Sequence, residues 1–138
     1  MVSFKNDFKV QPYYFTKHLR VINDFFDNKN IALTYCPWTK SGICFNKTFD
    51  KITDEMLISG YLYKDNMVPL DKAQNFYWSE MLLTIIGADN ISKTVKNFNL
   101  IEIIWKTVKE FFIEAKAYNN KKKRAKHHQH TVCQYFIL

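Results

Sequence analysis

The stretch that decides the fold is "TYCPWTKSGICFNK", residues 34–47, which places two cysteines, a proline, a tryptophan and a glycine within one short segment. The preceding residues 31–36, "IALTYC", form an apolar run of the length and composition of a buried strand. Pro37 then bends the chain, because proline cannot continue a strand's hydrogen-bond ladder. Residues 42–49, "GICFNKTF", read as a second strand. The segment therefore predicts two strands joined by a turn.

Further elements follow on either side of this pair. Residues 55–63, "EMLISGYLY", predict a third strand, and residues 66–71, "NMVPLD", predict an edge strand because Pro69 donates no hydrogen bond. Residues 76–87, "FYWSEMLLTIIG", fit a strand or a helix equally well. Residues 13–27, "YYFTKHLRVINDFFD", place apolar side chains at helical spacing, which predicts an N-terminal helical extension.

Residues 99–117 carry the clearest helical pattern in the chain. Apolar side chains recur at three- and four-residue intervals, and Asn99 is a suitable N-cap. Short strands followed by a long amphipathic helix predict an α+β fold: one small domain, residues 1–118, with a mixed or antiparallel sheet packed by this helix. Residues 119–138 are expected to form an extended basic C-terminal tail.

Composition limits the class of protein. The 138 residues are 47% hydrophobic and 17% aromatic, which suits one domain with a sizeable core. Apolar runs are too short to span a membrane, and the first residues resemble neither a secretory signal nor a transit peptide. Phe and Tyr, which have AT-rich codons, occur 12 and 8 times, whereas Gly and Pro occur 3 times each. An AT-rich genome is indicated, and we expect a mitochondrial, organelle-encoded protein or a bacterial cytoplasmic one.

The tail carries most of the formal net charge of +7. Its cations fall within six positions: Lys121, Lys122, Lys123, Arg124 and Lys126. Such a run neutralises phosphates with salt-sensitive, sequence-independent affinity, which predicts binding to RNA. A solvated tail or an anionic membrane surface explains the run equally well. We expect residues 131–138, "TVCQYFIL", to contact a neighbouring protein.

Three blocks, in this order, resemble the bacterial DUF3179 family: "YCPWTKSGICFNK" (35–47), "ISGYLYKDNMVPLDKAQNFYWSEML" (58–82) and "IIWKTVKEFF" (103–112). The resemblance covers about residues 31–118 and implies a reduced, divergent member of that family. Trp38 and Lys40 depart from its usual Leu and Gly. No reaction is established for the family, so the resemblance implies a fold and little chemistry. Motif residues that we expect to be structural are Tyr35, Cys36, Pro37, Gly60, Asn66, Asp71, Trp78 and Trp105.

Two groups of residues offer candidate thiol or metal chemistry. Cys36 and Cys44 lack the two-residue spacing of redox and zinc motifs, so we interpret both as buried structural residues, with Cys36 unreactive and Trp38 packed. His127, His128, His130 and Cys133 are ligand types for zinc or copper, but their spacing matches no standard closed site. We therefore predict no metal, no cofactor and no catalytic residue. Asp71 and Trp78 read as turn and core residues.

These observations favour a non-catalytic subunit of a large assembly. The leading hypothesis is a mitochondrial ribosomal protein whose basic tail contacts rRNA. The first alternative is a peripheral accessory subunit of a respiratory-chain complex, with the tail on anionic lipid or an acidic protein surface. The second alternative is a thiol- or metal-dependent redox protein built on Cys36 and a distant histidine.

Overall fold

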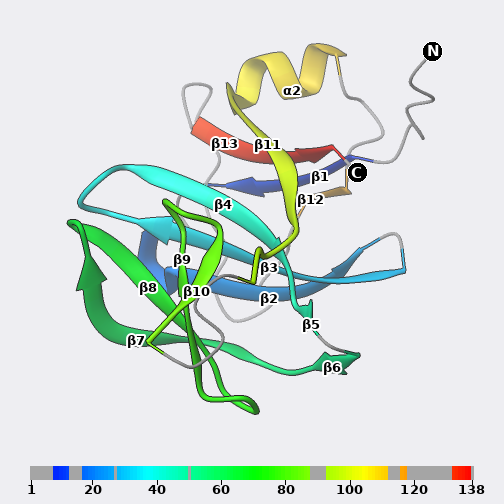
Figure 1. The fold of residues 1–138 in the computed structure, drawn as a ribbon. Helices are drawn as coiled ribbons and strands as arrows, with labels where there is room; N and C mark the ends of the chain where they lie inside the picture. The colour runs from blue at the N-terminus through cyan, green and yellow to red at the C-terminus, as the bar shows by residue number, and fades with distance from the viewer. Residues whose placement is uncertain are drawn as a thin grey trace.

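The computed structural model describes residues 8–12, 17–26, 28–49, 51–87, 93–111, 116–117 and 132–137, and strands dominate them (Figure 1). A seven-stranded sheet contains, from one edge to the other, β12 (Lys116–Ala117), β1 (Phe8–Pro12), β13 (Val132–Ile137), β11 (Asn97–Ile104), β4 (Ser41–Asn46), β3 (Lys29–Cys36) and β2 (Val21–Phe26). A four-stranded sheet contains β10 (Thr84–Ile86), β9 (Phe76–Ser79), β8 (Asn66–Asp71) and β7 (Met56–Tyr63). The strands β5 (Thr48–Phe49) and β6 (Ile52–Thr53) form a small ribbon.

The larger sheet is antiparallel except at one edge, where β1 and β12 run parallel. Strand β11 joins its two halves. Asn97 and Phe98 pair with β4, whereas residues 99–104 pair with β13. One long strand therefore holds the N- and C-terminal strands against the central hairpin β3–β4.

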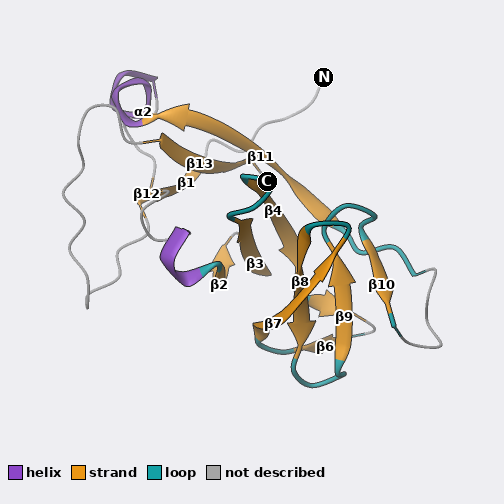
Figure 2. Cartoon of the chain, turned by 90° about the vertical axis from the view of Figure 1, so that its left-hand side faces the viewer, coloured by secondary structure: helices purple, strands orange, loops and turns teal. Residues whose placement is uncertain are grey.

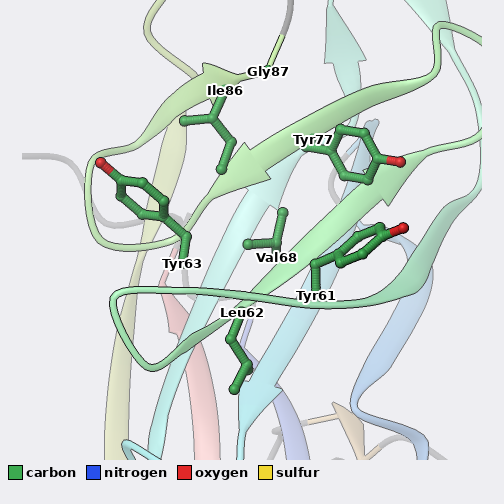
Figure 3. A pocket seen from close by; sticks show the side chains of 7 residues that line it. All are labelled: Tyr61, Leu62, Tyr63, Val68, Tyr77, Ile86 and Gly87. Carbon is green, nitrogen blue, oxygen red and sulfur yellow. The ribbon is translucent and has the colours of Figure 1, made fainter.

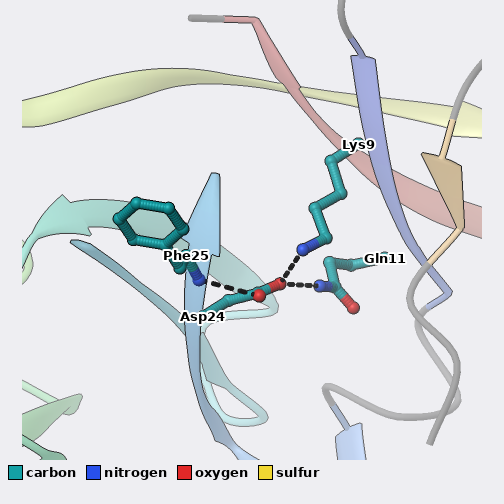
Figure 4. Close-up of polar contacts among 4 residues, drawn as sticks. All are labelled: Lys9, Gln11, Asp24 and Phe25. Atoms are coloured by element: carbon teal, nitrogen blue, oxygen red, sulfur yellow. Dashed lines mark hydrogen bonds and ion pairs between the residues drawn. The ribbon is translucent and has the colours of Figure 1, made fainter. Parts of the chain in front are cut away.

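Polar contacts show that this sheet curls (Figure 4). The carboxylate of Asp24, on the edge strand β2, lies 2.6 Å from the ammonium of Lys9 and accepts a hydrogen bond from Gln11 Nε2 at 3.4 Å. Lys9 and Gln11 belong to β1, near the opposite edge. The sheet therefore bends far enough to bring strands from its two ends into contact.

The four-stranded sheet covers one face of the β3–β4 hairpin (Figure 2). Ala32 and Phe45 pack there against Met56, Trp78 and Ile85. The rings of Phe45 and Trp78 meet edge to face, with centroids 5.5 Å apart. Strand β3 is consequently buried on both faces, which explains why its sequence is an uninterrupted apolar run rather than an alternating one.

A second apolar cluster lies on the other face of β3 and contains Ile22, Phe26, Ile31, Leu33 and Cys44. Helix α2 (Trp105–Phe111) contributes a third, smaller cluster in which Val108 packs with Val10 of β1. None of the helices among the described residues is both long enough and apolar enough to cross a membrane.

The expected α+β fold with a long amphipathic helix over 99–117 is wrong. Residues 97–104 form strand β11, and of the described part of the expected helix only residues 105–111 are helical. The segment "LIEII" satisfies helical spacing, but its β-branched residues also suit a strand, and pairing with β13 and β4 decides between the two. The fold is mostly β.

The expected helix over 13–27 is also wrong where the structure describes it. Residues 17–19 make one helical turn, and residues 21–26 form β2, paired along its whole length with β3. Residues 13–16 lie outside the described residues. Strand pairing again outweighs a helical pattern that rests on few apolar positions.

One further expectation about strands needs correction. Strand β8 lies inside its sheet, although it contains Pro69. Its ladder to β9 involves only Leu70 and Asp71, so the missing amide hydrogen of Pro69 leaves that ladder intact. A further finding is that residues 132–137 form β13 between β1 and β11 of the chain's own sheet. The expected contact of residues 131–138 with a neighbouring protein stays a prediction.

Candidate functional site

A small pocket of about 130 Å³ opens where the two hairpins β3–β4 and β7–β8 meet. The thiol of Cys36, the last residue of β3, forms part of its wall. The side chain of Cys36 is fully buried within this wall. The residues that line the pocket are Arg20, Cys36, Pro37, Trp38, Gly60, Leu62 and Met67.

Tight turns connect the segments that line this pocket. Residues 37–40 connect β3 to β4 and end at Lys40, which has a φ of 54°. The turn between β7 and β8 uses Lys64 and Asp65, both with positive φ, as a tight hairpin requires. Arg20 also has a positive φ of 59°, and its carbonyl accepts a hydrogen bond from Tyr35 N at 2.8 Å. This bond ties the backbone of Arg20 to β3, and Arg20 contributes to the lining of the pocket.

Hydrogen-bond donors converge on the sulfur of Cys36. The backbone amide of Met67 donates to Sγ at 3.3 Å. Groups of Thr39 and Trp38 in the following turn also lower the pKa of this thiol, and the thiol can itself donate to the carbonyl of Asp65, 4.0 Å from the sulfur. The Met67 amide and the groups of the turn favour an anionic sulfur, whereas the contact with Asp65 suits the neutral thiol.

The hydroxyl of Thr39 belongs to a small polar network beside the pocket. Its Oγ1 lies 2.7 Å from the Oγ of Ser41, and that Oγ accepts a hydrogen bond from Asn66 Nδ2 at 3.4 Å. This network holds the Thr39 hydroxyl, which is one of the groups that lower the pKa of Cys36.

The pKa of Cys36 reflects the balance of these effects. Burial by itself raises the pKa of a thiol, but the hydrogen bonds from Thr39, Met67 and Trp38 outweigh it and hold the pKa of Cys36 below its ordinary value of 9.0. A lowered pKa increases the fraction of nucleophilic thiolate at neutral pH.

Cys44 provides a contrast within the same hairpin. It lies directly opposite Leu33 and shares the apolar cluster on the other face of the sheet. Burial, with a smaller contribution from the charge of Asp24, raises the pKa of Cys44 far above the usual range. The sequence places two cysteines close together, but the alternation of β4 puts them in opposite environments.

A buried carboxyl group lies near the middle of the same face of β3 as Cys36. Glu80 follows β9, is 2% exposed, and has no hydrogen-bond partner on either carboxylate oxygen among the described residues. Burial raises the pKa of Glu80 to about 7, and the nearby hydroxyl of Thr34 offsets only part of that cost. That hydroxyl donates a hydrogen bond to Ile43 O at 3.2 Å. With a pKa of about 7, Glu80 is a neutral acid at slightly acidic pH.

The structure gathers part of the expected motif set around the thiol. Cys36, Pro37 and Gly60 line the pocket, and Asn66 reaches it through Ser41. Tyr35 is buried on the opposite face of β3. Motif residues separated in sequence therefore meet at one place in the fold.

The remaining motif residues have structural environments. The carboxylate of Asp71 accepts hydrogen bonds from the backbone and side chain of Gln74 in a turn, and Trp78 is fully buried in the core, as predicted for both. Trp105 packs beside the small cluster under helix α2. The expectation that Trp38 packs is wrong, because 64% of its surface is exposed.

The predicted RNA-binding cations, Lys121, Lys122, Lys123, Arg124 and Lys126, lie outside the described residues, as do His127, His128 and His130. The chain that contains them connects β12 to β13, and both strands lie next to β1. Among the described residues, no three His, Cys, Asp or Glu side chains are grouped to hold a metal ion.

Sequence reasoning missed three parts of the site. Arg20 comes from a segment with no recognisable motif, and Met67 contributes its backbone amide, which side-chain identity does not reveal, so only the fold brings them to the pocket. The role of Thr39 had a detectable signal. In the segment Cys-Pro-Trp-Thr, the hydroxyl stands at the third position after the cysteine, where a turn returns it toward the sulfur.

Comparison with known proteins gives one match. The sequence model of the family described as "Protein of unknown function (DUF3179)" matches residues 1–135, which includes the pocket, the helix and nearly all of β13. No curated protein and no solved structure matches the chain. The match extends well beyond residues 31–118, over which the resemblance is visible by inspection. The chain therefore belongs to the DUF3179 family.

Proposed function

We propose that this chain is a thiol protein in which Cys36 reacts reversibly with small electrophiles that enter its pocket. The observation that carries the proposal is the set of hydrogen-bond donors that converge on a buried sulfur at the wall of a cavity. This proposal replaces the expectation of an unreactive Cys36. It develops the thiol branch of the second alternative that the sequence left open.

The geometry suits attack on a sulfur electrophile. The Cys36 thiolate attacks one sulfur of a small disulfide or thiosulfonate, the bond between its two sulfur-bearing groups breaks, and the departing group leaves with the electron pair and takes a proton from water. A second thiol reverses the reaction by attacking the mixed disulfide. Arg20 gives the entrance a positive charge, which favours anionic leaving groups.

The second thiol must come from another molecule, as far as the described side chains are concerned. Cys44 is the only other cysteine whose side chain is described, and it lies on the opposite face of the sheet. The volume of about 130 Å³ corresponds to only about four water molecules at liquid density. We therefore propose a substrate of a few heavy atoms, or the narrow end of a larger one.

Thiol labelling of the folded protein tests this proposal. Methyl methanethiosulfonate should add once to the native protein, and intact mass should show that Cys36→Ser removes this adduct while Cys44→Ser keeps it. The bulkier dithiobisnitrobenzoate should react more slowly at the same site. Labelling that begins only when denaturant unfolds the protein, or that persists in Cys36→Ser, would contradict the proposal.

A second candidate function rests on the cationic connection between β12 and β13. We propose that the chain is a structural subunit of a mitochondrial ribosome or of a respiratory-chain complex, as the sequence suggested. A bacterial cytoplasmic location is the alternative to a mitochondrial one. The supporting observation is the run of five cations, which suits phosphate contacts. Replacing all five with serine should weaken RNA binding and flatten its dependence on salt. An unchanged affinity in this variant would reject the RNA role.

A further inference from the structure

A second cavity lies on the face of the four-stranded sheet that points away from the core (Figure 3). Its volume is about 520 Å³, within the range of roughly 300–1,000 Å³ typical of small-molecule sites. Val68 and Ile86 form its apolar floor, and three tyrosines stand around them: Tyr61, Tyr63 and Tyr77.

An irregularity in β7 creates this arrangement. Residues 59–61 oppose only Val68 of β8, so the strand bulges between Ile58 and Leu62. Gly60 takes a φ of 83° within the bulge. The hydroxyl of Ser59 fixes the geometry, since it donates to the carbonyl of Val68 and accepts a hydrogen bond from the amide of Tyr61. The bulge thereby directs the Tyr61 ring toward Tyr77.

The aromatic groups present flat apolar surface to the cavity. The rings of Tyr61 and Tyr77 lie 5.7 Å apart at 74°, as two walls that meet at a corner. Tyr61 is 64% exposed, although an aromatic side chain is normally covered. Val68, beneath the rings, is only 2% exposed, so neighbouring side chains already cover it and a ligand ring would contact the exposed tyrosine ring instead.

The charges around the cavity restrict what it takes. None of the described residues that line it is charged, so they offer no compensation to a charge that loses its hydration at the centre. The ammonium of Lys64 lies at the rim, 5.6 Å from the centroid of the Tyr63 ring. The phenol groups add hydrogen-bond donors. This distribution suits a ligand whose apolar ring lies inside and whose acceptor or anionic group lies at the rim.

We propose that this cavity binds a small aromatic molecule that carries one anionic group, with its ring between Tyr61 and Tyr77 and its anion beside Lys64. The proposal is independent of the thiol chemistry. Cys36 lies on the core side of the β7–β8 hairpin, whereas this cavity lies on its outer face. Leu62 lines both pockets and marks the boundary between them.

Fluorescence titration with two probes tests the proposal: anilinonaphthalene sulfonate, which is anionic, and N-phenylnaphthylamine, which is neutral. Tyr61→Ala should weaken the binding of both probes by about two- to tenfold, because it removes one aromatic wall. Lys64→Gln should weaken the binding of the anionic probe alone, by about two- to fivefold, as expected for an exposed charge pair. Both substitutions alter exposed side chains, and circular dichroism confirms that each variant is folded.

Phe111→Ala is the matched control, since Phe111 is 73% exposed on helix α2, away from the cavity. It should leave both affinities unchanged. The site is rejected if Tyr61→Ala binds the probes as wild type does, or if Phe111→Ala weakens them equally. The anionic group is rejected if Lys64→Gln affects neither probe or both alike.

Discussion

Replacing Thr39 with valine tests the influence of its hydroxyl on the Cys36 thiol. Valine keeps the shape of the side chain but removes the hydroxyl that helps to lower the pKa of Cys36. A hydrogen bond to a charged group contributes about 1.5–3 kcal/mol, and about 1.4 kcal/mol corresponds to one pKa unit. Because Thr39 is exposed, solvent screens part of this contribution. We therefore expect the pKa of Cys36 to rise by about one.

The rate of labelling should change in opposite directions on the two sides of the pKa. Below both pKa values the variant holds about tenfold less thiolate, but each thiolate is more nucleophilic by a Brønsted slope of about 0.4–0.5, so it should react about threefold more slowly. Above both pKa values the thiolate fraction is complete in each protein. There the variant should react about threefold faster.

The assay is the pH dependence of methyl methanethiosulfonate labelling in a Cys44→Ser background, followed by intact mass. Thr48→Val is the control, because its hydroxyl bonds to Thr53 Oγ1 at 2.7 Å in the β5–β6 ribbon and does not contact the thiol. The two pH profiles should cross for Thr39→Val and superimpose for Thr48→Val. A Thr39→Val profile identical to wild type would refute the role given to this hydroxyl.

Three further predictions concern stability. With the pKa of Glu80 at about 7 in the folded protein and near 4.5 unfolded, the folded state keeps a proton that the unfolded chain releases, so stability falls as pH rises from about 4.5 to 7 by up to about 3 kcal/mol. Glu80→Gln should remove this slope in urea denaturation, and an unchanged slope would exclude Glu80 as its source. Asp24→Asn should lower the free energy of unfolding by about 1–3 kcal/mol, because Lys9 keeps a largely buried charge without its partner. A thermal midpoint equal to that of wild type would show that the curl of the sheet does not depend on this pair. Gly60→Ala should lower the free energy of unfolding by about 1 kcal/mol, because alanine is strained at the positive φ of this position. An added Cβ meets no atom within 4 Å, so a steric clash adds nothing to this effect. Equal stability of this variant would argue against the bulge geometry.

The strands around the opening motif could be predicted because their patterns are local. The apolar run over residues 31–36 and the aromatic content of residues 55–63 each favour extended chain by themselves, and Pro37 favours a break between strands. The structure has strands over residues 31–36 and 56–63 and a turn over residues 37–40. The predictions of helices over residues 13–27 and 99–117 were wrong because the local pattern there is ambiguous. Their apolar spacing is compatible with either periodicity, and the choice depends on partner strands distant in sequence.

The candidate site divides in the same way. Membership of the DUF3179 family and the presence of Cys36 within a motif were evident from the order of residues along the chain. The environment of the sulfur was not, since Arg20, Met67 and Asn66 reach Cys36 and Thr39 only after two hairpins pack together. Cys44 shows the difference most clearly, because eight residues along a hairpin place it on the opposite face, in an apolar cluster.

By itself, then, the sequence determined the family, the strands of the central hairpins and the turn that carries Cys36, because backbone preference and side-chain alternation act over a few residues. The tertiary structure alone decided that the fold is mostly β, that strands from the two ends of the large sheet meet, and that one cysteine faces hydrogen-bond donors while the other faces hydrocarbon. These outcomes depend on which strands pair and which faces are covered. Strand pairing and burial are properties of contacts between distant segments, and no single segment of the chain contains them.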